Sequence, residues 1–208
     1  MRKLLVAALL CLSPLLPGAA TAADATYRVD LIVFQDLWFA GNEAGVPAGA
    51  PNLQGAIKLD DVAALKAAGI EVLPDDQFGL DAEWKNIRYS KQFRPLARLA
   101  WTQKNPPQER GPALQIQYGP DANAHTAAVV DNAGSLGGAP RVEGSVALLL
   151  NRYLHLDVDL QYVDQGTAWP IDERRRMRRD ELHHLDSPRL GVLARVTKAA
   201  GADNDATQ

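Results

Sequence analysis

Five arginines stand within six residues near the end of the chain, and we call residues 174–179 the arginine segment. They are Arg174, Arg175, Arg176, Arg178 and Arg179. A guanidinium is planar and permanently charged, and its N–H groups can hold a carboxylate through two parallel hydrogen bonds. The whole chain has 22 basic and 25 acidic residues, a net charge of −3, so the segment is opposite in sign to its surroundings. This contrast points to a site for an anionic ligand.

In an extended conformation, the side chains of this segment would alternate between two faces. One face would carry Arg174, Arg176 and Arg178, and the other Arg175, Met177 and Arg179. Guanidinium groups are rarely buried without partners, so we expect the edge of a sheet or a solvated ribbon instead of a central strand. Two interpretations stay open. The arginines bind a ligand, or they pair with nearby Asp and Glu residues and protect a sheet edge from aggregation.

Tryptophan rings could add stacking surfaces for sugars, although burial in the core is their commoner role. The chain has four: Trp38, Trp84, Trp101 and Trp169. Trp169 directly precedes the arginine segment, and we expect it to be the accessible one.

The residue patterns of most enzymes are missing from this sequence. It contains no G-x-S-x-G or S-x-x-K nucleophile motif, no HExxH and no phosphate-binding glycine loop. Carboxylates such as Glu173, Glu181 and Asp186 could form a glycosidase pair, and His155 with Asp157 an acid–base pair. Acidic pairs are common among 25 carboxylates, so their spacing alone discriminates nothing. We expect a binding protein and not an enzyme.

A metal site is not expected either. His183, His184 and Asp186 carry suitable ligand atoms, but neighbouring histidines on a strand point to opposite faces. The only cysteine, Cys11, lies in the N-terminal apolar run. We therefore predict neither a metal nor another cofactor.

The distribution of apolar residues predicts mostly strands. We expect them at residues 27–36, 70–73, 96–103, 113–118, 142–150, 152–163 and 190–196, and short helices at 59–69 and 80–92. Asp60 is the expected cap of the first helix and Gly69 its end. In the strand at 152–163, Leu154, Leu156, Val158 and Leu160 should face the core. This order predicts a single α+β domain with a largely antiparallel sheet and two helices on one face.

The two ends of the chain look different from the rest. Arg2 and Lys3 precede an apolar run and a small-residue stretch at 19–23, a pattern typical of a signal peptide over residues 1–23. The run is too short to predict a stable membrane span. The domain would then cover 24–198, and a disordered tail 199–208. An exported, acidic chain is a poor match for nucleic acid.

Several segments together resemble the CsiV family of periplasmic proteins. They are Tyr27–Phe34, Phe93–Leu96, Trp101–Gln103, Arg152–Asp157, Arg175–Arg178, Glu181–His183, Asp186–Pro188 and Gly191–Leu193. The resemblance implies a non-enzymatic, periplasmic peptidoglycan-binding accessory of cell-wall synthesis. Its implied partners are peptidoglycan and a class A penicillin-binding protein with its lipoprotein activator. A purely protein–protein adaptor is the alternative, and a cell-wall hydrolase a less favoured one. The expected ligand-binding residues are Arg175, Arg176, Arg178, Arg179, Trp169, Glu181 and His183.

Overall fold

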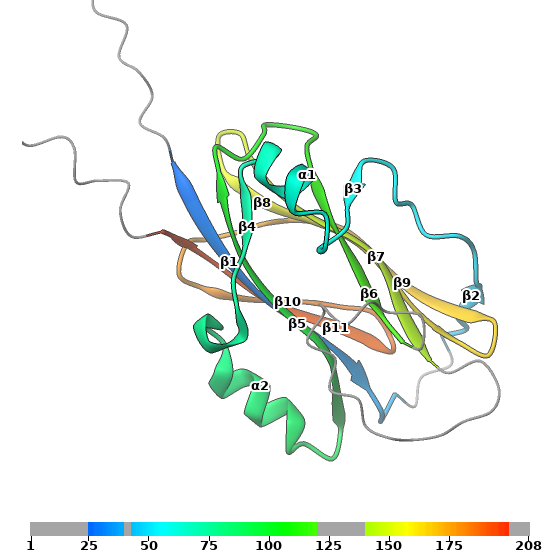
Figure 1. Cartoon of the computed structure of the whole chain (residues 1–208). Helices are drawn as coiled ribbons and strands as arrows, with labels where there is room; N and C mark the ends of the chain where they lie inside the picture. Colours follow the sequence, from blue (N-terminus) through cyan, green and yellow to red (C-terminus); the bar gives the residue numbers. More distant parts are fainter. Residues whose placement is uncertain (1–24, 40–42, 120–139, 200–208) are drawn as a thin grey trace, which may run out of the picture.

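Two β-sheets pack face to face in the computed structural model, which describes residues 25–39, 43–119 and 140–199 (Figure 1). The first sheet contains, from edge to edge, β10 (Leu182–Asp186), β11 (Leu190–Lys198), β1 (Thr26–Asp36), β5 (Phe93–Lys104) and β4 (Ile70–Val72). The second contains β2 (Val46–Pro47), β9 (Thr167–Arg176), β8 (Leu154–Asp164), β7 (Arg141–Leu150), β6 (Ala113–Tyr118) and β3 (Ala56–Ile57). Neighbouring strands are antiparallel except β3 and β6, so the largely antiparallel prediction is confirmed.

The main core lies between the two sheets. Alternate residues of β8 face it as expected, namely Leu154, Leu156, Val158 and Leu160. Each such side chain stabilises the fold by about 1.5–3 kcal/mol. Gln35 of β1 crosses the core and donates a hydrogen bond of 2.8 Å to the Tyr162 hydroxyl of β8. Burial raises the pKa of Tyr162 to about 12, so this hydroxyl stays protonated at neutral pH.

Strand β1 is buried on both faces, in keeping with its apolar run at 31–34. Val29, Leu31 and Val33 face the second sheet. Ile32 and Phe34 face the opposite way, into a second cluster on the outer side of the first sheet. A strand with two apolar faces needs a cover on each, and helix α2 provides the outer one.

Helix α2 (Asp81–Arg88) lies outside the sandwich against the first sheet (Figure 1). Its Trp84 and Ile87 enter the second cluster together with Phe78 and Leu80. A short 3-10 turn, η1 (Asp75–Gln77), leads into it. The connection is fastened by Asp30, which is 1 % exposed and accepts 2.7 Å and 2.8 Å hydrogen bonds from the Gly79 amide and from Arg28. The Asp30 carboxylate raises the pKa of Arg28 through this hydrogen bond.

Helix α1 (Val62–Ala67) has a different neighbourhood. Its Leu65 enters the core between the sheets, whereas α2 belongs to the outer cluster. The two helices therefore do not share one cluster, which differs from the expected pair on one face of one sheet. The cap is Asp61, not Asp60, because Asp61 Oδ1 accepts the Ala64 N–H at 3.0 Å. Gly69 ends the turn with a φ of 68°, as expected for glycine.

The expected signal peptide at 1–23 lies outside the described residues, as do residues 200–208 of the expected tail. Among the residues that are described, no helix is both long and apolar enough to cross a bilayer.

Candidate ligand-binding site at the β9 edge

The arginine segment is positioned by the hairpin of β8 and β9. Its two turn residues, Gln165 and Gly166, have φ values of 48° and 80°, which suit a tight two-residue hairpin. Asp164 is opposite Thr167, and the same register places His155 opposite Arg176. On its other side, β9 pairs only at Thr167 and Ala168, with β2. In the described chain, the arginine end of β9 is thus an exposed sheet edge, as the sequence predicted.

The side chains alternate at this edge. Arg174 and Arg176 lie on the outer surface of the second sheet, and Met177 is 4 % exposed in the core. Arg175 lies on the same side as Met177, at the rim of the sandwich, and is partly buried. The buried methionine therefore anchors the strand end that carries the exposed arginines.

Three of the five arginines have a carboxylate partner among the residues that the structure describes. Arg174 Nη2 lies 2.6 Å from Asp157, and this hydrogen bond raises the pKa of Arg174. Arg175 Nε lies 2.7 Å from Glu173, and Arg178 Nη1 3.7 Å from Glu181. The last pair is largely exposed, at 74 % and 56 %, so it holds Arg178 weakly. For Arg174 and Arg175, the edge-protection interpretation describes the structure well.

Arg176 is different, because its partner is an aromatic ring. Its guanidinium carbon lies 3.5 Å from the centroid of the Tyr153 ring, in the turn between β7 and β8. Arg152 lies 5.4 Å from the same centroid. Tyr153 itself is 37 % exposed. We call Arg152, Tyr153 and Arg176 the Tyr153 cluster; neither of its arginines forms an ion pair with a carboxylate of the described residues.

The turn that follows β9 carries two further arginines, Arg178 and Arg179. The Arg178 backbone N–H donates a 3.0 Å hydrogen bond to His183 Nε2, and Asp180, with a φ of 65°, donates its N–H to the Val196 carbonyl. Arg179 is exposed and makes no ion pair within the described residues. His183 thus accepts a hydrogen bond from the turn backbone, and Glu181 is the exposed ion-pair partner of Arg178.

Trp169 does not lie where the sequence led us to expect. It is partly buried against the main core because it falls on the same side of β9 as Ile171. Its ring lies 5.9 Å from the ring of Tyr162, and Arg189 covers it at 4.7 Å. The exposed tryptophan is Trp38, at 64 %, in the segment after β1.

The side chains that could have formed catalytic or metal sites are engaged separately. Asp157 and Glu173 pair with arginines, and His155 Nδ1 is 3.0 Å from the Tyr153 carbonyl. His183 holds the turn, while His184 stacks on Phe34 at 5.7 Å. The described residues contain no group of three or more His, Cys, Asp or Glu side chains suited to a metal ion.

The described part of the chain is a β-sandwich whose second sheet carries an exposed, arginine-rich edge. Residues 3–199 match the family described as "Peptidoglycan-binding protein, CsiV". The chain therefore belongs to the CsiV family, which confirms the resemblance noted from its motifs. No curated protein and no solved structure matches it.

Proposed function

We propose that this protein binds peptidoglycan without catalysis, through the Tyr153 cluster and the neighbouring Arg178 and Arg179. The observation that carries the proposal is the stacking of Arg176 on Tyr153 at 3.5 Å, without a carboxylate partner among the described residues. The ring holds the guanidinium in place and leaves its N–H edge for a ligand. Peptidoglycan offers free carboxylates on its stem peptides, the anions that such a fork binds best.

Among the residues expected from the sequence, Arg176, Arg178 and Arg179 stay in this proposal as ligand contacts. Glu181 and His183 act by shaping the turn, and Arg175 by closing the rim with Glu173. Tyr153 replaces Trp169 as the aromatic member, because the Trp169 ring already contacts Tyr162 and Arg189.

We further propose a periplasmic location, with export directed by residues 1–23. There, the bound protein would support a class A penicillin-binding protein and its lipoprotein activator, as the family resemblance implies. The alternative is a protein–protein adaptor, in which the same arginines would contact an acidic protein surface instead of the wall polymer.

Co-sedimentation with purified sacculi tests the proposal. Replacing Arg176 and Arg179 together with Ala should weaken binding at least tenfold, since a loss of about 1.4 kcal/mol already gives that factor. The matched control is Arg88→Ala with Arg110→Ala, which removes the same charge from exposed sites elsewhere and should bind normally.

Sacculi whose carboxylates have been converted to amides identify the group that is recognised. Binding of the native protein should fall to the level of the Arg176/Arg179 variant on these sacculi, and added salt should weaken it further. Equal binding of the variant and the native protein to untreated sacculi would leave the arginines as edge protection alone. Binding to a periplasmic protein but not to sacculi would favour the adaptor.

A further inference from the structure

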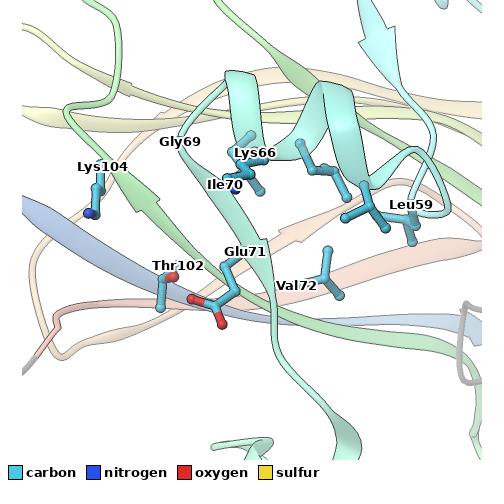
Figure 2. Close-up of a pocket in the computed structure, with 10 residues that line it drawn as sticks. Leu59, Lys66, Gly69, Ile70, Glu71, Val72, Thr102 and Lys104 are labelled. Carbon is cyan, nitrogen blue, oxygen red and sulfur yellow. The ribbon is translucent and has the colours of Figure 1, made fainter.

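A groove lies on the opposite sheet from the arginine segment, between α1 and the strands β4 and β5 (Figure 2). Its volume is about 590 Å³, within the range of clefts that hold a ligand. Its apolar lining consists of Leu59, Val62, Leu65, Ile70 and Val72. Val62 is 72 % exposed, although it is apolar and stands on an ordered helix. We call this cleft the β4 groove.

The floor of the β4 groove is an unpaired sheet edge. Strand β4 is the last strand of the first sheet and pairs only with β5. The Lys104 N–H donates to the Gly69 carbonyl and the Leu73 N–H to the Ala100 carbonyl. In an antiparallel ladder, bonded residues alternate, so Glu71 bonds to β5 as well. The N–H and C=O groups of Ile70 and Val72 therefore point away from β5, where the described chain supplies no strand.

The charges around the β4 groove favour an acidic occupant. Lys66 on α1 and Lys104 on β5 line it against a single carboxylate, Glu71 (Figure 2). Neither lysine forms an ion pair with a carboxylate of the described residues. The chain as a whole has more acidic than basic residues. Two lysines without an ion pair among the described residues therefore give this apolar cleft a local positive charge.

We propose that the β4 groove binds an extended, acidic segment of a partner protein, which adds a strand to β4. Such a segment would bond to the free groups of Ile70 and Val72, and alternate apolar side chains would enter the groove. Its acidic side chains would meet Lys66 and Lys104. A fatty acyl chain would also fill the apolar lining. It would leave the backbone groups of Ile70 and Val72 without hydrogen bonds, however, and its single carboxylate could pair with only one of the two lysines.

The first experiment selects octapeptides from a random phage-displayed library on the purified protein. Enriched peptides should alternate apolar and acidic residues, and the free peptides should slow hydrogen exchange at the Ile70 and Val72 amides. Lys66→Glu with Lys104→Glu should weaken their binding at least tenfold. The matched control, Lys85→Glu with Lys91→Glu, makes the same charge change near α2 and should bind them normally.

Val72→Pro separates a peptide from a lipid. It removes the outward N–H at an edge position, where proline is tolerated, and keeps the ladder to β5. The variant should lose the selected peptides while its melting temperature and its binding to sacculi stay near those of the native protein. Val62→Glu, on the exposed side of α1, gives a second block that does not involve the strand.

Three results would overturn the proposal. One is a selection that enriches no peptide whose binding depends on the two lysines. Another is full peptide binding by both Val72→Pro and Val62→Glu. The third is tight binding of dodecanoate in the groove without protection of the Ile70 and Val72 amides, which would identify an acyl-chain site. None of these results depends on whether the arginine segment binds sacculi.

Discussion

Two of the arginines that lie over aromatic rings, Arg98 and Arg176, differ in what else they contact. Arg98, on the outer side of the first sheet, lies 5.1 Å and 5.3 Å from the ring centroids of Phe78 and Trp84. Its N–H groups also reach two carboxylates, Asp75 and Asp81, both at 3.2 Å. Arg176, on the second sheet, stacks on Tyr153 but has no carboxylate from the described chain.

The comparison shows that an arginine stacked on an aromatic ring can have either a structural or a ligand-binding role. Around Arg98 the protein supplies both acids from η1 and α2, so the guanidinium fastens that segment to the sheet. Around Arg176 the ring alone fixes the guanidinium, and its hydrogen-bonding capacity stays open to an external anion. The missing carboxylate, more than the number of arginines, is what makes the second sheet the candidate binding surface.

The largest effect on stability is expected from Arg98→Ala. Its side chain is 18 % exposed, and the change removes two ring contacts and two ion pairs whose acids are themselves more than half exposed. We expect a loss of about 1–3 kcal/mol in the free energy of unfolding, measured by urea denaturation. Binding of the folded protein to sacculi should stay unchanged. A variant that kept its stability and lost binding would reverse the roles that we assign to the two arginines.

An effect of intermediate size is expected from giving Arg176 a carboxylate partner, as Arg98 already has. His155 is the cross-strand partner of Arg176, so His155→Glu would supply the carboxylate that this arginine lacks. We expect binding to sacculi to fall about three- to tenfold, with a stability gain below about 1 kcal/mol.

His155→Gln is the matched control for that experiment, because it has the same length without the charge and should bind nearly as the native protein does. Equal loss in the Glu and Gln variants would mean that the imidazole itself contacts the ligand. Unchanged binding in both would remove Arg176 from the site.

The sequence predicted the strands well because their signals are local. The segment 113–118 is a strand with the predicted bounds, and the expected inward residues of β8 are buried. The division into two sheets could not be predicted in the same way. Strand β1 pairs with β5 and β11, and those pairings join segments far apart along the chain. The apolar residues on both sides of β1 indicated that the strand is buried, but they did not indicate which strands pair with it.

The sequence predicted where the arginines of the candidate site lie, but not which groups they contact. Composition located the arginines and the strand periodicity located them at an edge, but neither says which guanidinium meets a carboxylate. That depends on the register set by Gln165 and Gly166, which places Asp157 opposite Arg174 and His155 opposite Arg176. A two-residue hairpin assumed at this Gln-Gly pair would have brought Arg176 next to the turn that contains Tyr153. The alternation of side chains along β9 also places Trp169 on the same side as Ile171, where it is partly buried.

The smallest expected effect concerns an acid that lacks an arginine. Asp159 faces Asp172 across β8 and β9, one step along the strand surface from the Asp157–Arg174 pair. Burial, then Asp172, raises the pKa of Asp159, and Asp157 adds to this, while a hydrogen bond with Asn52 acts the other way. A carboxyl whose pKa is higher in the folded state stabilises the fold below its unfolded pKa of about 3.9. That contribution is lost as the pH rises through the folded pKa.

Asp159→Asn should therefore melt at a higher temperature than the native protein at pH 7, by about 1–4 °C for a gain below about 1 kcal/mol. The difference should shrink as the pH falls below about 4, because the native carboxyl is then neutral as well. Asp76→Asn, at an exposed position in η1, is the control and should show no such dependence. A difference that grew on acidification would mean that Asp159 is stabilised as an anion. The Asp159–Asp172 pair would then be favourable like the neighbouring Asp157–Arg174 pair, and Arg176 would still have no carboxylate partner among the described residues.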